Sequence, residues 1–450
     1  MSAAPPRSHD GEVSPTPARP ATATSMSGER PRLDRAAAER VARLLTSLAA
    51  EPAGGGPVAD ASGPDRQRAG TARQDPDRDD DLTSLVRLAF HHRLPGLVWH
   101  EFGRIHQDDP RLAPLADAYR DASARHLGQL AQLAQLAPAL GEADPTWMVM
   151  KGPVLAGHVY ADPGLRTSLD IDILVRPDRF GAALAAIEDA GGRARQRNWP
   201  LLTRLELGQL VVDLPLGGLG DLHWHLVNTP YARRRFALDM DELRERRREL
   251  SLSGVRIATL DPCDTILHLC LHGALSGGHL LVWSKDVARA VSTLTPDWDE
   301  LVRRAHRYGL GLVTAIQLER SRIVLGAPVD RAVITALAPG NPLVAARSRA
   351  DRTGRAIWAR GRWTGKMLTS ALGSSTMHSV TELARRFPIE VVLPRLREAI
   401  GTGESRPPGQ SLLTEEHGGE RERERFLAFV SSQDGGRAAG PRRTAGPGRS

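Results

Sequence analysis

Two aspartates in the middle of the chain, Asp170 and Asp172, have a spacing that suits a metal site. They lie in the run LRTSLDIDILVRPDRF, residues 165–180, which predicts a β-strand. Successive side chains of a strand point to opposite faces, so both carboxylates share one face. Divalent cations such as Mg²⁺ or Mn²⁺ bind carboxylate oxygens. The pair is therefore a candidate metal site, although a solvated strand with an acidic face has the same pattern.

A lysine, a glycine and an arginine flank this strand in sequence. The short apolar run TWMVM predicts another strand that ends at Lys151 and Gly152, and Pro153 favours the first turn of a helix. Gly152 allows a close backbone approach. Arg166 precedes the acidic strand, where a loop could direct its guanidinium toward phosphate groups. Each of the two charges, taken alone, also fits a solvated surface residue.

The elements that would position these residues alternate between strand and helix from about residue 146 to 260. A predicted helix with Asp178 as N-cap follows the acidic strand. Two further strands are predicted in RLELGQLVVDL and DLHWHLV, with a turn at the glycines between them. The pattern then becomes helical, beginning with Asp261 as N-cap and Pro262 at the first helical position. This order predicts an α/β (α+β) fold.

Taken together, these residues resemble a bacterial family of uncharacterised nucleotidyltransferases within the DNA polymerase beta superfamily. The resemblance implies a small mixed sheet with three carboxylates that hold two Mg²⁺ (or Mn²⁺) ions. It also implies transfer of an NMP from an NTP, with release of pyrophosphate. It covers about residues 80–300 and rests on Lys151, Gly152, Tyr160, Arg166, Ser168, the run 170–175, and the later runs DLHW and LHLCLH.

The resemblance assigns roles to several positions. Asp170 and Asp172 would be the first two metal ligands. Asp221 fits the third, because family members carry an acid just before a His-Trp pair, and Asp213 is its rival. Either could instead be an exposed carboxylate at a strand end. Nucleotide contacts are implied for Lys151, Gly152, Arg166 and Ser168.

Three histidines are candidate accessory residues. His223 lies two residues after Asp221 and shares its face of the predicted strand. His268 and His272 are one helical turn apart, on the face that also carries Asp264. Such a helical set could bind zinc, or it could contact the nucleotide or the acceptor. Ordinary core histidines also fit this pattern.

Composition indicates where the protein is located and how the rest of the chain is organised. The 450 residues have a formal net charge of +7 and two cysteines, Cys263 and Cys270, which we expect to be core thiols. No signal peptide and no run of 18 apolar residues is present, so we expect a cytoplasmic protein without a membrane span. We expect a disordered tail (1–80), a helical platform (81–145), a nucleotidyltransferase core (146–260), a helical region (261–400) and a second disordered tail (401–450). A helix is possible in the first tail at RLDRAAAERVARLLTSLAA, and the second tail contains a short charged helix, EEHGGERERERFLAFV.

The predicted function is metal-dependent transfer of an NMP from an NTP to an unidentified acceptor. The acceptor could be a small molecule, a peptide, a protein or the end of a nucleic acid. A non-catalytic nucleotide- or nucleic-acid-binding protein on the same fold is the alternative. The basic segment 345–366 carries two tryptophans and could contact nucleic acid, although an arginine-rich solvated surface fits it as well.

Overall fold

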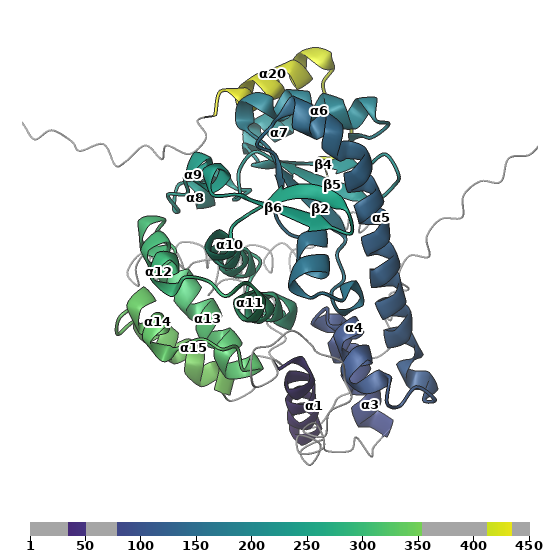
Figure 1. Ribbon diagram of the computed structural model, residues 1–450, viewed down its shortest axis with the longest axis vertical. Helices are drawn as coiled ribbons and strands as arrows, with labels where there is room; N and C mark the ends of the chain where they lie inside the picture. Colours follow the sequence, from purple (N-terminus) through teal and green to yellow (C-terminus); the bar gives the residue numbers. More distant parts are fainter. Residues whose placement is uncertain (1–34, 51–78, 353–411, 434–450) are drawn as a thin grey trace, which may run out of the picture.

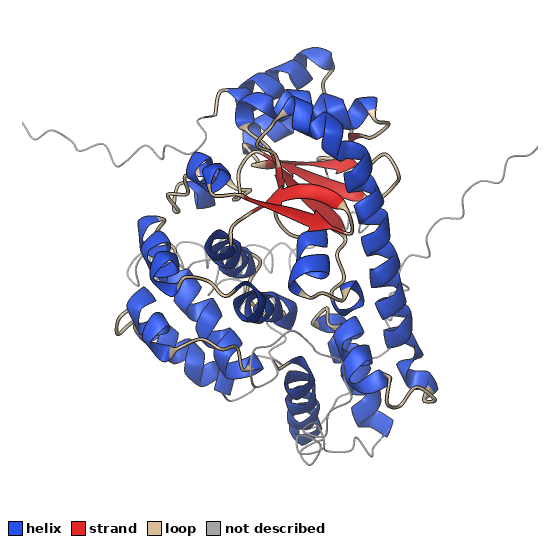
Figure 2. Cartoon of the chain, in the orientation of Figure 1, coloured by secondary structure: helices blue, strands red, loops and turns tan. Residues whose placement is uncertain are grey.

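The computed structural model describes residues 35–50, 79–352 and 412–433 (Figure 1). Most of these residues form helices, which surround one small sheet and a hairpin (Figure 2). The predicted α/β (α+β) fold with a mixed sheet is confirmed. Within the described ranges, no helix combines the length and the hydropathy that a membrane span requires.

A five-stranded mixed sheet, in the order β1-β2-β5-β4-β3, carries the acidic residues. The strands β2 and β5 run parallel, with Asp172 opposite Asp221, and the other neighbouring pairs are antiparallel. Because paired residues project to the same side, these two carboxylates share one face. The strands are Met148–Val149 (β1), Asp170–Leu174 (β2), Arg193–Ala194 (β3), Gln209–Asp213 (β4) and Leu219–His223 (β5).

The opposite face of the sheet is apolar and packs against α5 (Ala113–Ala143) and α6 (Phe180–Asp189). Ile171 and Ile173 of β2 are fully buried in this core. A shift of β2 by one residue would exchange these isoleucines for the aspartates, so the alternation fixes the register. The long helix α5 contributes one apolar row to this core: Leu130, Leu133, Leu136 and Leu140.

A second, larger apolar core lies among the helices that follow the sheet. The first of them, α10, begins as predicted, because the Asp261 carboxylate accepts a hydrogen bond from the backbone N–H of Asp264 at 2.7 Å. Leu174 of β2 also belongs to this core, which joins the helices to the acidic side of the sheet. The helices are α10 (Pro262–Leu275), α11 (Leu281–Leu294), α12 (Trp298–Arg307), α13 (Gly311–Leu325), α14 (Arg331–Leu337) and α15 (Pro342–Arg352).

The sequence prediction missed several elements between residues 199 and 260, among them the short helices α8 (Pro230–Arg233) and α9 (Met240–Glu245). The helix α7 (Trp199–Leu205) includes the first residues of the predicted strand RLELGQLVVDL. The Asn198 side chain caps this helix. An antiparallel hairpin of β6 (Arg248–Leu252) and β7 (Val255–Thr259) follows and was not predicted. It packs beside β1, and one of its side chains, Thr259, donates to the Val149 carbonyl at 2.7 Å.

The predicted N-cap at Asp178 was wrong. The Asp178 carboxylate accepts from the guanidinium of Arg176 at 2.9 Å and makes no cap hydrogen bond. A short 3₁₀ turn precedes the helix, which begins at Phe180. The nearby arginine therefore outcompetes the backbone N–H groups for this side chain.

The predicted helical platform is helical. It consists of α3 (Asp79–His91), the short α4 (Pro95–Val98) and α5, with brief turns between them. The helix α3 packs against α1 (Arg35–Ala49), which lies within the predicted N-terminal tail.

Each predicted tail contains its expected short helix, and both helices pack against the fold, which the prediction of disordered tails did not include. Leu45 of α1 is fully buried. In α20 (Glu420–Ser431), Phe426 and Val430 are fully buried in the core beneath the sheet and pack near α6 and α7. A short apolar stripe is enough to attach such a helix, and the polar average composition of the segment conceals it. The remaining residues of both predicted tails lie outside the described ranges.

Replacing Phe426 by Ala should lower the free energy of unfolding by about 3–5 kcal/mol, the usual cost of removing a buried phenyl ring. The ring lies 6.2 Å from that of Phe180 and 5.7 Å from that of Trp199. Chemical denaturation of the full chain measures the change. Glu424→Ala, an exposed position on the same helix, is the control. Equal and small effects of both substitutions would show that α20 does not stabilise the fold.

Candidate active site

The acidic site is formed where β2 and β5 lie side by side. Asp172, Asp221 and His223 each place one potential ligand atom within 4.8 Å of the others. Asp172 and His223 are buried, and Asp221 is half-buried. Asp170 lies two residues before Asp172 on the same face and is half-buried. The parallel pairing thus gathers the carboxylates of two separate strands at one place.

Lys151 and Gly152 lie against the acidic strand because β1 ends directly before them. The backbone N–H of Met150 donates to the carbonyl of Asp172 at 3.1 Å, and Lys151 Nζ lies 3.0 Å from Asp172 Oδ1. Gly152 has a φ of +56°, and a Cβ at this position would lie 2.7 Å from the carbonyl oxygen of Asp170. Glycine is therefore required here for both the conformation and the close approach.

The pKa values of the site's carboxylates are shifted in opposite directions. Burial alone would raise the pKa of Asp172, but the Lys151 ammonium and the His223 hydrogen bond together hold it well below its usual range. Burial and the negative charges of Asp172 and Asp170 together raise the pKa of Asp221 to about 6. Burial and the Asp172 charge also raise the pKa of Asp170. A divalent cation would relieve this repulsion.

Of the two candidates for a third carboxylate, the structure places Asp221 beside Asp172. Asp213 lies at the end of β4, where it pairs with Arg193 at 2.9 Å and Arg195 at 2.8 Å. Those two arginines offset its charge. The geometry therefore favours Asp221.

Two glutamines contact the site although sequence reasoning did not select them. Gln209 Nε2 donates to Asp221 Oδ2 at 2.8 Å. Gln129 Nε2 donates both to Ser168 Oγ and to the carbonyl of Asp170, each at 3.0 Å. Gln209 reaches Asp221 because β4 neighbours β5, and Gln129 comes from α5. No local sequence signal gives either neighbour.

Arg166 lies against α11 and ties the loop before β2 to that helix. Its guanidinium pairs with both carboxylate oxygens of Asp286, at 2.8 and 3.0 Å, and the Tyr160 hydroxyl donates to the same carboxylate at 2.9 Å. Asp286 is another residue that sequence reasoning did not select. Arg166 and Ser168 both have partners within the protein, and their nucleotide contacts stay predictions.

Zinc binding was one of three interpretations of Asp264, His268 and His272 on α10, and these side chains form no metal-ligating group among the described residues. Asp264 pairs with Arg246 and with Arg304, each at 2.9 Å, and is thereby separated from the two histidines of its helix. In the part of the chain that the structure describes, the acidic cluster with His223 is the one group of three close metal-ligating side chains. Burial, together with the positive charge of Lys151, lowers the pKa of His268 to about 3.

Residues 78–320 match a family model described as an uncharacterised nucleotidyltransferase, which covers more than half of the chain. The chain belongs to this family. Searches of curated proteins and of solved structures returned no match. The matched residues include the whole five-stranded sheet and α10. Membership supports a transferase that uses an NTP.

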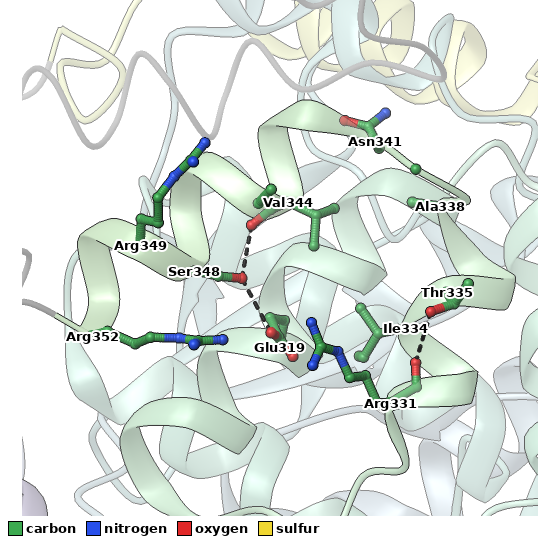
Figure 3. A pocket seen from close by; sticks show the side chains of 12 residues that line it. Glu319, Arg331, Ile334, Thr335, Ala338, Asn341, Val344, Ser348, Arg349 and Arg352 are labelled. Atoms are coloured by element: carbon green, nitrogen blue, oxygen red, sulfur yellow. Dashed lines mark hydrogen bonds between the residues drawn. The ribbon is translucent and has the colours of Figure 1, made fainter.

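A cavity of about 380 Å³ lies between α13, α14 and α15 (Figure 3). Arg331, Arg349 and Arg352 are among its lining residues, and no residue of the acidic cluster lines it. The last two of these arginines belong to the basic segment 345–366. The rest of that segment, with both tryptophans, lies outside the described residues, so its contact with nucleic acid stays a prediction.

Asp221→Asn should stabilise this protein at pH 7.5. The pKa of Asp221 is about 6 in the folded chain and 3.8 in its ordinary state. The stability that the protonated carboxyl contributes is complete below pH 3.8 and is lost as the pH rises through 6. The gain in unfolding free energy should be on the order of 2 kcal/mol at pH 7.5 and small near pH 4.

Asp213→Asn is the matched control, and its effect should have the opposite sign. Burial would raise the pKa of Asp213, but Arg193 and Arg195 outweigh it and lower the pKa. This partly exposed carboxylate therefore adds up to about 1 kcal/mol at pH 7.5, which is lost as the pH falls through its lowered pKa. Urea titrations at both pH values measure each variant. Destabilisation by Asp221→Asn at pH 7.5 would contradict these charge assignments.

Proposed function

We propose that this protein transfers an NMP from an NTP to an acceptor, with release of pyrophosphate, as in the DNA polymerase beta superfamily. One observation carries the proposal. The in-register pairing of β2 with β5 sets Asp172 beside Asp221, and Asp170 shares their face of the sheet. Family membership supports an NTP as the donor.

The side chains of this face suit Mg²⁺ or Mn²⁺. Asp170, Asp172 and Asp221 would hold the metal, because these cations prefer carboxylate oxygens. When bound, the metal would neutralise charge on the transferring phosphate and align the attacking and leaving oxygens. His223 Nε2 lies 3.2 Å from Asp172 Oδ1, so we assign to His223 the role of orienting that carboxylate.

The chain's own groups would position the reactants. The Lys151 ammonium lies beside the carboxylates and can pair with triphosphate oxygens. An oxygen of the acceptor would bond to the α-phosphorus while the bond to pyrophosphate breaks, and its proton would pass to a carboxylate.

Incubation with each NTP, Mg²⁺ or Mn²⁺ and candidate acceptors tests the proposal, with mass analysis for an NMP adduct and for pyrophosphate. The acceptors are small molecules, peptides, proteins and nucleic-acid ends, including those of a cell extract. Asp170→Asn should lower the rate at least ~100-fold through the loss of one charge-stabilising group. This substitution leaves the buried pair of Lys151 and Asp172 intact.

Asp178→Asn is the control, because it changes a surface carboxylate paired with Arg176. It should leave the rate and the stability essentially unchanged. Metal-dependent NTP binding without an adduct from any acceptor would instead favour a non-catalytic nucleotide-binding protein. No metal-dependent binding of any NTP would contradict the proposal.

A further inference from the structure

A row of aromatic rings extends along α10 to the first turn of α11. The ring centroids of His268 and His272 are 6.2 Å apart. The indole of Trp283 lies 6.4 Å from His272 and 5.3 Å from His279, and both imidazoles are almost perpendicular to it, at 84° and 85°. We call His268, His272, His279 and Trp283 the imidazole–indole strip.

One end of the strip lies on the acidic side of the sheet. The apolar core around α10 contains Leu174 of β2, which shares a face of its strand with Asp172. The helix that carries His268 and His272 therefore packs on that side of the sheet. His268 is 5% exposed, whereas His272 is half-buried.

The other end of the strip is anchored next to the loop before β2. Asp286, one helical turn after Trp283, holds the guanidinium of Arg166 in a bidentate ion pair. Arg166 lies four residues before Asp170 in the chain. Trp283 and His279 are half-buried residues. The strip thus extends from the acidic side of the sheet to residues that are partly exposed.

The His268 ring is a buried polar group at the α10 end of the strip. Neither of its ring nitrogens has a hydrogen-bond partner among the described residues, although the side chain is buried. A buried polar group without a partner costs about 1–3 kcal/mol. Burial and Lys151 keep the pKa of His268 low, so the ring is neutral, with one nitrogen to donate and one to accept. Such a ring suits an uncharged polar partner.

We propose that the imidazole–indole strip binds the nucleobase of the NTP, with Trp283 stacking on the base and His268 bonding to its polar edge or to the ribose. This inference rests on the proposed function. A base is flat, uncharged and rich in donors and acceptors, which matches the strip, and stacking on an aromatic side chain tolerates any base. The triphosphate would then lie toward Lys151 and the acidic strand.

Calorimetric titration with Mg²⁺-tripolyphosphate and with each Mg²⁺-NTP separates the two parts of the ligand. The parent should bind at least one NTP about tenfold or more tightly than tripolyphosphate, since stacking of one base contributes about 1–3 kcal/mol. Trp283→Leu should remove most of this ratio and leave tripolyphosphate affinity unchanged, and Trp283→Phe should restore part of it. Trp298→Leu, at a half-buried tryptophan of α12, should leave the ratio intact.

His268→Leu adds a readout that a structural role would not produce. It should weaken NTP binding relative to tripolyphosphate and at the same time raise the stability of the free protein, because an apolar side chain replaces an unpartnered one. A loss of stability with an unchanged affinity ratio would overturn its place in the strip.

The outcomes distinguish this inference from the proposed function. Equal affinity of the parent for every NTP and for tripolyphosphate would overturn the strip as a base site and leave the transferase proposal standing. Equal losses for NTP and tripolyphosphate in Trp283→Leu would also overturn it. No metal-dependent binding of any of these ligands would overturn both.

Discussion

The parallel pairing of β2 with β5 is the interaction on which the site depends. It sets Asp172 against Asp221 in register and places Asp170 and His223 on the same face. The isoleucines that alternate with the aspartates are buried on the other face against α5 and α6. Burial of that face holds the carboxylates together against their mutual repulsion, because separating the strands would expose the isoleucines.

Positive charge compensates the three carboxylates of the site unequally. Asp172 is paired with Lys151 and hydrogen-bonded to His223, whereas Asp170 and Asp221 keep raised pKa values. Removing Asp172 would leave the Lys151 ammonium buried without its partner, which costs several kcal/mol whatever the function. Substitutions of Asp170 and Asp221 therefore test the function with less destabilisation of the fold than a substitution of Asp172.

Local patterns predicted much of the site. The alternation in residues 170–175 gave the strand and its two faces, and Asp261 with Pro262 gave the start of α10. The placement of Lys151 and Gly152 beside the acidic strand also follows the predicted order of strand, turn and helix.

Contacts between segments that are far apart in sequence could not be predicted from local patterns. The partner of Arg166 is Asp286, on a helix 120 residues later, and Gln209 meets Asp221 only through the order of the strands. The packing of α20 depends on Phe426 meeting Phe180 and Trp199, which lie far away in sequence. Sequence separation hides such pairs, since local periodicity reports only which face of an element is apolar.

A crystal structure with Mn²⁺ and a non-hydrolysable NTP tests the central claim most directly, because the anomalous signal of manganese locates the ion independently of the protein. We predict a manganese ion bonded to the carboxylates of Asp172 and Asp221, with the triphosphate beside it. Manganese bound only at Asp213 or elsewhere on the surface, with no ion between β2 and β5, would contradict a catalytic metal site on these strands.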